Sequence, residues 1–171
     1  MRLFATALSA LALGLAAPAV AAPVTVKPVA IDAALQKEFE DNYGEREIAF
    51  LQRAIANALT RELTAAGGTI GDGAPVVIET TLVGARPSRP TFQQASERPG
   101  LDIIRSISLG GAELRARVVR ADGTAVSEVT HKWYESDLLY SNATTTWSDA
   151  QRAIRRFADK VGDAYRAGAG S

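Results

Sequence analysis

The 171-residue chain contains no cysteine, one histidine and one methionine, and its 19 basic residues equal its 19 acidic residues in number. Without cysteine there can be no disulfide, thiolate nucleophile, cysteine-ligated metal or lipobox. With His131 as the sole imidazole, we expect neither a metal site nor a cofactor. A balanced charge provides no field that would attract nucleic acid, so a DNA or RNA partner is not expected.

Long hydrophobic runs are also absent except at the start of the chain. Arg2 precedes the apolar stretch Leu3–Leu15, and Pro18 lies ahead of small residues that end at Ala22. This order is typical of a secretory signal peptide cleaved after Ala21. We therefore expect residues 1–21 to be removed and no membrane-spanning segment to remain. An alanine-rich signal in a chain without cysteine favours a bacterial periplasmic or secreted protein.

Residues 22–171 are enough for one domain with a sizeable core. Apolar residues at helical spacing predict helices over residues 45–66 and 148–167, and residues 24–29 and 75–83 have the composition of strands. Residues 168–171 are expected to fray. The order of these elements predicts an α+β fold, with a small, mostly antiparallel sheet of about four strands and two main helices on one face.

The clearest local pattern is a hairpin. Residues 112–120 and 124–134 flank Asp122-Gly123, which predicts a type I′ turn. The register then places Arg117 opposite Glu128 and Glu113 opposite Lys132, and it turns His131 toward the apolar face.

Residues 84–105 form the strongest candidate for a binding site. Long connections in compact domains are often binding loops, and this one is rich in proline and arginine. Arginine offers paired donors to carboxylates and phosphates, and an exposed aromatic ring can anchor a partner. The candidate residues that contact a partner or an anion are Arg86, Arg89, Phe92, Arg98 and Tyr134. A solvated insertion that covers a sheet edge is the competing interpretation.

No catalytic constellation is apparent. The chain has no G-x-S-x-G motif and no glycine-rich phosphate loop followed by Lys-Ser/Thr. The alternative to a binding protein is an envelope hydrolase that acts on glycan or peptide and uses Glu135 or Asp137 with His131. Along an extended strand, four residues separate His131 from Glu135 by about 13 Å, which disfavours direct cooperation.

Three blocks of sequence, residues 89–94, 105–114 and 147–157, resemble small exported proteobacterial domains of unknown function. The resemblance is one of layout and implies a periplasmic α+β domain without an assigned active site. Several envelope-assembly accessory proteins are similar in layout, which favours binding over catalysis by analogy. We therefore expect an exported accessory protein of the cell envelope whose partner is an envelope protein or an anionic ligand. The sequence leaves its oligomeric state open.

Overall fold

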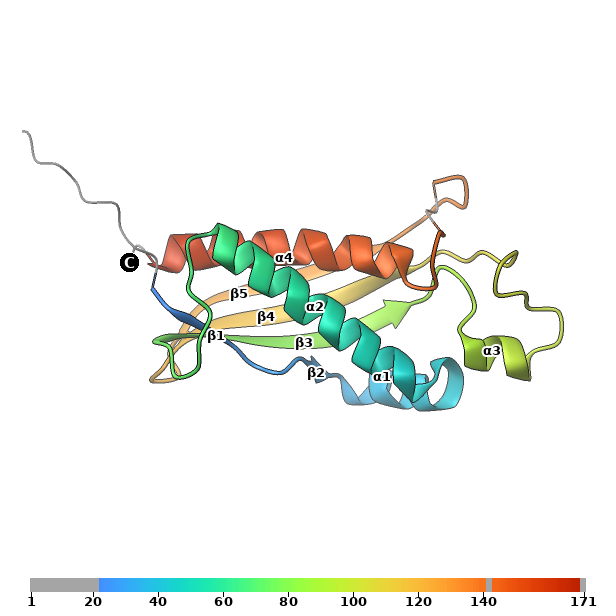
Figure 1. Cartoon of the computed structure of the whole chain (residues 1–171), viewed down its shortest axis with the longest axis horizontal. Helices are drawn as coiled ribbons and strands as arrows, with labels where there is room; N and C mark the ends of the chain where they lie inside the picture. Colours follow the sequence, from blue (N-terminus) through green and yellow to red (C-terminus); the bar gives the residue numbers. More distant parts are fainter. Residues whose placement is uncertain (1–21, 141–142, 170–171) are drawn as a thin grey trace, which may run out of the picture.

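The computed structural model describes residues 22–140 and 143–169, so the predicted signal peptide lies outside the described residues. The elements, in chain order, are β1 (Val24–Val26), β2 (Ala30–Ile31), α1 (Ala33–Glu38), the π-helix η1 (Phe39–Tyr43), α2 (Glu45–Ala65), β3 (Val76–Arg86), α3 (Phe92–Glu97), β4 (Gly111–Arg120), β5 (Ala125–Tyr134) and α4 (Ser148–Ala169). Figure 1 shows them gathered into one elongated body. No helix in the described ranges is long and apolar enough to cross a membrane.

The five strands form one mixed, mostly antiparallel sheet, which confirms the predicted α+β class. The strand order is β1-β3-β4-β5, and β2 also pairs with β3. The predicted first strand, residues 24–29, is shorter than expected: β1 ends at Val26, and β2 begins only at Ala30, because Pro28 has no amide hydrogen to donate to the ladder. On either side of it, the amides of Lys27 and Asp32 donate to the carbonyls of Ile78 and Leu82 on β3.

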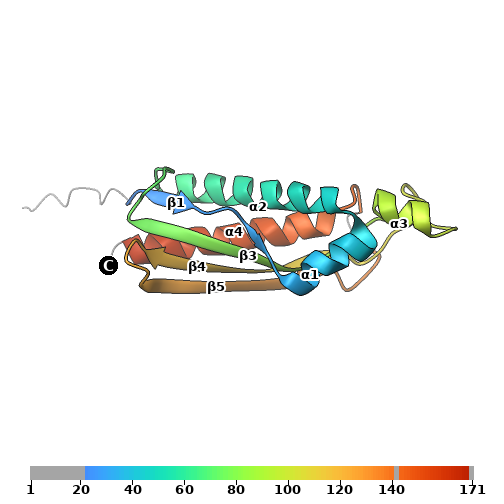
Figure 2. The ribbon, with the colours of Figure 1, turned by 90° about the horizontal axis from the view of Figure 1, so that it is seen from below.

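Helices α2 and α4 cover one face of the sheet, as Figure 2 shows. Their apolar stripes meet the sheet in a single core. On α4 the predicted stripe is fully buried: Ala150, Ile154, Phe157, Val161 and Tyr165 are each at most 2% exposed. The opposite face of the sheet carries the charged pairs of the hairpin and lacks a covering helix in the described part of the chain. The core therefore lies between the sheet and the two helices.

The predicted register of the hairpin is confirmed. Arg117 pairs with Glu128 and Glu113 with Lys132, and their charged atoms lie 3.6 Å and 3.0 Å apart. The predicted type I′ turn is wrong, because only Gly123 has a positive φ. The Gly123 amide donates to the Arg120 carbonyl, so residues 120–123 form the turn, one residue earlier than predicted, and it ends on a left-handed glycine. A bulge between Val118 and Val119 then restores the predicted pairing.

The long connection is more ordered than the sequence suggested. Strand β3 continues to Arg86 after a register shift between Leu82 and Gly84, so the connection begins at Pro87. It contains α3, whose start is fixed by a capping box between Thr91 and Gln94. Helix α4 likewise extends to Ala169, beyond the predicted start of a frayed tail.

The connections 87–110, 135–140 and 143–147 lie at one end of the body, which we call the loop end. They do so because β3 and β5 end there and β4 begins there, as the pairing of Arg86 with Gly111 and of Gly111 with Tyr134 requires. Strand β1 begins at the opposite end (Figure 1). All five candidate site residues therefore belong to the loop end or border it.

Candidate functional site

Arg86 and Tyr134 meet across a glycine. The register places Arg86, Gly111 and Tyr134 side by side on three adjacent strands. The Arg86 guanidinium lies 5.1 Å from the centre of the Tyr134 ring. A Cβ on Gly111 would lie 2.6 Å from Tyr134 Cδ1, and one on Gly84 would lie 2.7 Å from Tyr134 Oη. The two glycines therefore allow the ring to lie close over the sheet, where it holds the guanidinium in place.

Beside this pair is a cleft of about 240 Å³, which we call the arginine cleft. Arg86 and Arg98 line it together with Tyr43, and its apolar lining is Pro87, Pro90, Leu101 and Ile107. Arg98 Nη2 donates to Asn42 Oδ1 at 3.2 Å. Neither guanidinium forms an ion pair with any carboxylate of the described residues. Two oriented cations thus border a small apolar hollow.

The two tyrosines near Arg86 remain hydrogen-bond donors rather than acids at physiological pH. Burial raises the pKa of Tyr43 far above its ordinary value, and the hydrogen bond from its hydroxyl to Glu38 Oε1, 2.7 Å long, raises it further. Burial also raises the pKa of Tyr134, with a second contribution from the nearby charge of Glu113. The cleft therefore presents positive charge and the neutral phenol of Tyr43, and Tyr134 lies neutral beside Arg86.

Arg89 and Phe92 lie apart from the cleft. The Nε of Arg89 donates to the carbonyl of Ala143, so this arginine joins the connection 87–110 to the start of α4. Phe92 is 78% exposed on α3 and borders a different hollow of about 430 Å³, formed with Gly44 and Gln93. Of the five candidates, the structure brings together Arg86, Arg98 and Tyr134. Sequence reasoning missed Tyr43, because its proximity depends on η1 folding against the connection.

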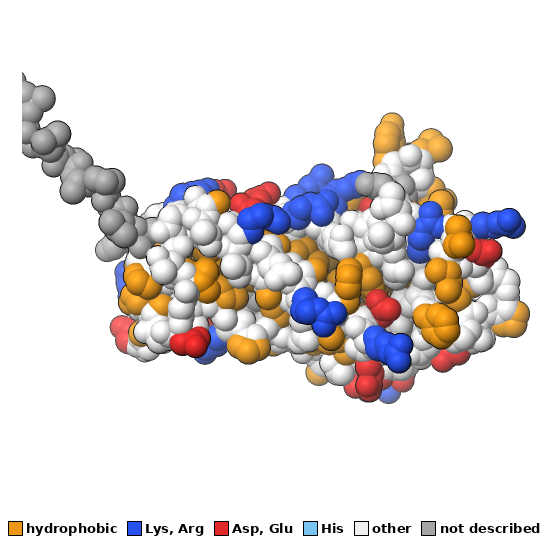
Figure 3. Space-filling model, in the orientation of Figure 1, with side chains coloured by type: hydrophobic (Ala, Val, Ile, Leu, Met, Phe, Trp, Pro, Cys, Tyr) orange, Lys and Arg blue, Asp and Glu red, His pale blue; other side chains and the backbone are white. Residues whose placement is uncertain are grey.

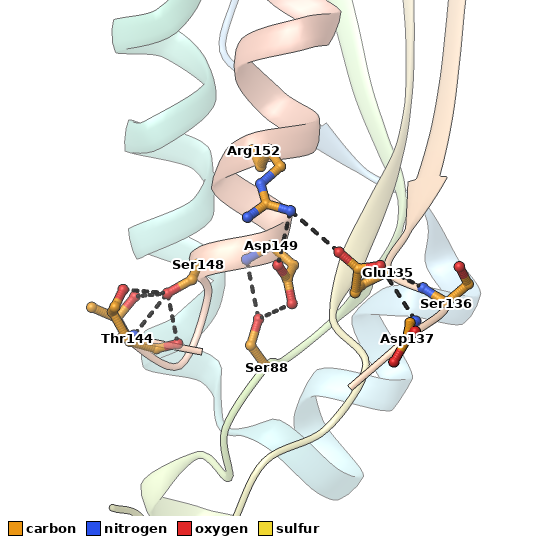
Figure 4. Close-up of polar contacts among 9 residues, drawn as sticks. Ser88, Glu135, Ser136, Asp137, Thr144, Ser148, Asp149 and Arg152 are labelled. Carbon is orange, nitrogen blue, oxygen red and sulfur yellow. Dashed lines mark hydrogen bonds and ion pairs between the residues drawn. The ribbon is translucent and has the colours of Figure 1, made fainter. Parts of the chain in front are cut away.

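A buried polar network fixes the base of the loop end (Figure 4). Ser88 and Asp149 are both fully buried, and the Ser88 hydroxyl donates to Asp149 Oδ2 at 2.9 Å. Arg152 Nη1 lies 3.9 Å from Asp149 and 3.3 Å from Glu135. The network joins the end of β3 to the end of β5 and to the first turn of α4. It therefore positions the walls of the cleft.

The residues named for a hydrolase have other partners. Glu135 binds Arg152, and its Oε1 also accepts the amides of Ser136 and Asp137. His131 lies opposite Leu114, as the register predicted, and is buried. Its Nδ1 is 3.1 Å from Lys160 Nζ. No hydrogen bond between the imidazole and either carboxylate is present in the described part of the chain.

Possible metal ligands are dispersed. Within residues 22–140 and 143–169, no group of three histidine or acidic side chains converges in a way that could hold a metal ion.

Comparison with known proteins gives a likeness at the level of structure. No family model matches the chain, and no curated protein matches it by sequence. Similar solved structures include PelC from Paraburkholderia phytofirmans, with 14% identity, a TM-score of 0.49, and coverage of 86% of this chain and 88% of that one. Another is XCC0632 from Xanthomonas campestris, of family DUF330, with 11% identity, a TM-score of 0.47, and coverage of 86% and 85%. A third is CT253 from Chlamydia trachomatis, with 10% identity, a TM-score of 0.49, and coverage of 85% and 99%.

Proposed function

We propose that the chain is an exported accessory protein of the bacterial cell envelope that binds a protein partner through the arginine cleft. The observation that supports this proposal most directly is the pair Arg86 and Arg98, two cations without a carboxylate partner in the described residues that border one apolar hollow. Export is supported by the signal-peptide pattern of residues 1–21.

The chemistry of the cleft selects an acidic group attached to an apolar one. A guanidinium binds a carboxylate through two parallel hydrogen bonds, which are stronger than bonds between neutral groups. Tyr134 orients Arg86 and Asn42 orients Arg98, so little conformational entropy remains to be lost when an anion binds.

The size of the cleft favours part of a protein over a free metabolite. Sites for drug-sized ligands span roughly 300–1,000 Å³. At about 240 Å³ the arginine cleft falls below that range and suits one or two side chains of a partner. An aspartate or glutamate next to an aliphatic residue would place its carboxylate at the arginines and its neighbour against Pro87, Leu101 and Ile107.

The test is site-specific photo-crosslinking in intact cells. A photoreactive residue at Leu101, in the cleft, is compared with one at Arg120, beside the hairpin turn at the opposite end of the body. We expect one discrete adduct from position 101 and none from position 120. The double variant Arg86→Gln/Arg98→Gln should abolish the adduct, while Arg115→Gln/Arg120→Gln, made on exposed arginines of β4, should preserve it.

An adduct that survives loss of both cleft arginines would overturn the proposal, as would identical adducts from both positions. Circular dichroism of each variant distinguishes loss of binding from loss of fold.

A further inference from the structure

Two turns at the loop end share the same construction. In residues 102–105, Asp102 Oδ1 accepts the amides of Ile104 and Arg105, at 2.7 Å and 2.9 Å. In residues 137–140, Asp137 Oδ1 accepts the amide of Leu139 at 2.9 Å. Each turn thus consists of an aspartate that binds the backbone, two consecutive aliphatic residues, and then an arginine or a tyrosine. An aspartate that satisfies backbone amides in this way stabilises a tight turn.

The aliphatic residues of both turns project into solvent. Leu139 is 89% exposed, Ile104 78% and Tyr140 74%. Among the described residues, every exposed large hydrophobic side chain except Phe50 and Ile70 lies at the loop end: Phe92, Ile103, Ile104, Ile107, Leu138, Leu139 and Tyr140. Figure 3 shows hydrophobic side chains protruding at this end. Exposed apolar groups gathered in one region mark an interaction surface.

The shape of this surface points to a fluid partner. Side chains that are three-quarters or more exposed stand away from the body, so a rigid protein would need a separate hollow for each of them. A lipid monolayer admits projecting side chains without a preformed hollow. Tyrosine and arginine are also suited to the headgroup region, where a polar tip can remain hydrated above an apolar stem.

The charges nearby are compatible with phosphate-bearing headgroups. Arg105 is the last residue of the first turn, is exposed, and forms no ion pair among the described residues. The carboxylates closest in sequence to the projecting residues already have partners, since Asp102 and Asp137 bind backbone amides and Glu135 binds Arg152. Glu97, at the end of α3, is a further exposed carboxylate of the loop end, so the positive charge that Arg105 offers is local to the first turn.

We propose that the loop end docks on a phospholipid bilayer, with Ile104 and Leu139 inserted below the headgroups and Arg105 at the phosphates. The two turns extend from the same end of the sheet, so both can reach one surface (Figures 1 and 2). The docking residues Ile104, Arg105 and Leu139 do not line the arginine cleft, so variants at these positions test the docking separately from the proposed function.

The absence of cysteine from the chain allows a direct test. Single cysteines at Leu139, Ile104 and Ala121 are labelled with an environment-sensitive fluorophore and mixed with vesicles of phosphatidylethanolamine and phosphatidylglycerol. Ala121 is exposed in the hairpin turn at the opposite end. We expect a blue shift and increased emission at positions 139 and 104 and no change at position 121. An unchanged spectrum at positions 139 and 104, or an equal change at all three positions, would overturn the proposal.

A second measurement uses unlabelled protein and vesicle co-sedimentation. Ile104→Ser/Leu139→Ser should lower the partition coefficient at least tenfold. Ile70→Ser, which alters an exposed isoleucine away from the loop end, should leave it unchanged. If the fluorophore at position 139 responds to protein concentration without vesicles, the surface binds a second copy of the chain and the bilayer proposal is wrong.

Discussion

Ser88 and Asp149 are 61 residues apart in sequence, and each donates a hydrogen bond to the other. The Ser88 hydroxyl donates to Asp149 Oδ2 at 2.9 Å, and the Asp149 amide donates to the same hydroxyl oxygen at 3.1 Å. Both residues are fully buried. This pair joins the end of β3 to the first turn of α4 and so holds together two sides of the loop end.

Ser88→Ala should destabilise the fold, because the substitution removes a donor from a buried carboxylate and an acceptor from a buried amide. We expect the free energy of unfolding to fall by about 1–3 kcal/mol, measured by urea denaturation. Ser96→Ala is the matched control, since Ser96 is exposed and its hydroxyl binds only the nearby carbonyl of Gln93. Equal effects at the two positions would contradict a special role for the buried pair.

Gly111→Ala should disturb the contact between Arg86 and Tyr134. The added Cβ would lie 2.3 Å from the Trp133 carbonyl oxygen and 2.5 Å from Tyr134 Cα, so the backbone of β5 has to shift. Overpacking of this kind costs about 1–3 kcal/mol. Thermal unfolding measures the loss, and Gly71→Ala provides the control, since no atom lies within 4 Å of its added Cβ. A variant as stable as the native chain would refute the steric argument.

Stability should decline in mildly acidic solution because of His131. Burial lowers the pKa of this imidazole, and the positive charges of Lys160 and Arg156 lower it further. The unfolded chain therefore binds a proton more readily than the folded one, starting from an ordinary pKa near 6.5. The contribution is fully present above that pH and is lost as the pH falls toward the folded-state pKa.

The measurement for His131 is the unfolding midpoint at a series of pH values between 8 and 5, for the native chain and for His131→Gln. The native chain should lose more stability than the variant over the acidic part of the range. Parallel curves for the two proteins would show that other groups cause the dependence.

Trp147→Phe should weaken the attachment of α4 to α2. The indole Nε1 of Trp147 donates to Glu47 Oε2 at 2.5 Å, and the ring also packs against Phe39 and Tyr43. Hydrogen bonds to charged groups contribute about 1.5–3 kcal/mol. Glu47→Gln keeps an acceptor and should cost less than Trp147→Phe in the same denaturation experiment. The reverse order would contradict this prediction, because it would mean that the charge of Glu47 contributes more to stability than the indole of Trp147.

The hairpin could be predicted from sequence because its information is local. Charge pairs on one face and apolar residues on the other both change if the register slips by one residue, so Arg117 and Glu128 specify the alignment together. The type of turn could not be predicted in the same way. The Asp122 carboxylate accepts a hydrogen bond from the Thr124 amide at 2.8 Å, and the backbone of Asp122 keeps a negative φ. Gly123 is therefore the one residue of the turn in the left-handed conformation.

The candidate site was predicted in part. Arginine content along residues 84–105 predicts Arg86, Arg89 and Arg98 equally as binding residues. In the structure Arg89 instead donates to the backbone carbonyl of Ala143. That contact depends on how two distant connections fold against each other, and sequence periodicity carries no information about it. The sequence does not single out the turns at Asp102 and Asp137, because each is an ordinary short turn by itself and only their shared position at the loop end brings the two together.

The first described residue, Ala22, lies at the end of the body opposite the loop end. Ala22 is held at the far pole, where its carbonyl accepts a hydrogen bond from the hydroxyl of Tyr165 and the amide of Val24 binds Thr69. The 21 residues of α2 alone extend about 30 Å along the same axis. A tag attached ahead of Ala22 would leave the loop end unobstructed. A domain fused at the same position would lie a full body length from any surface that the loop end binds.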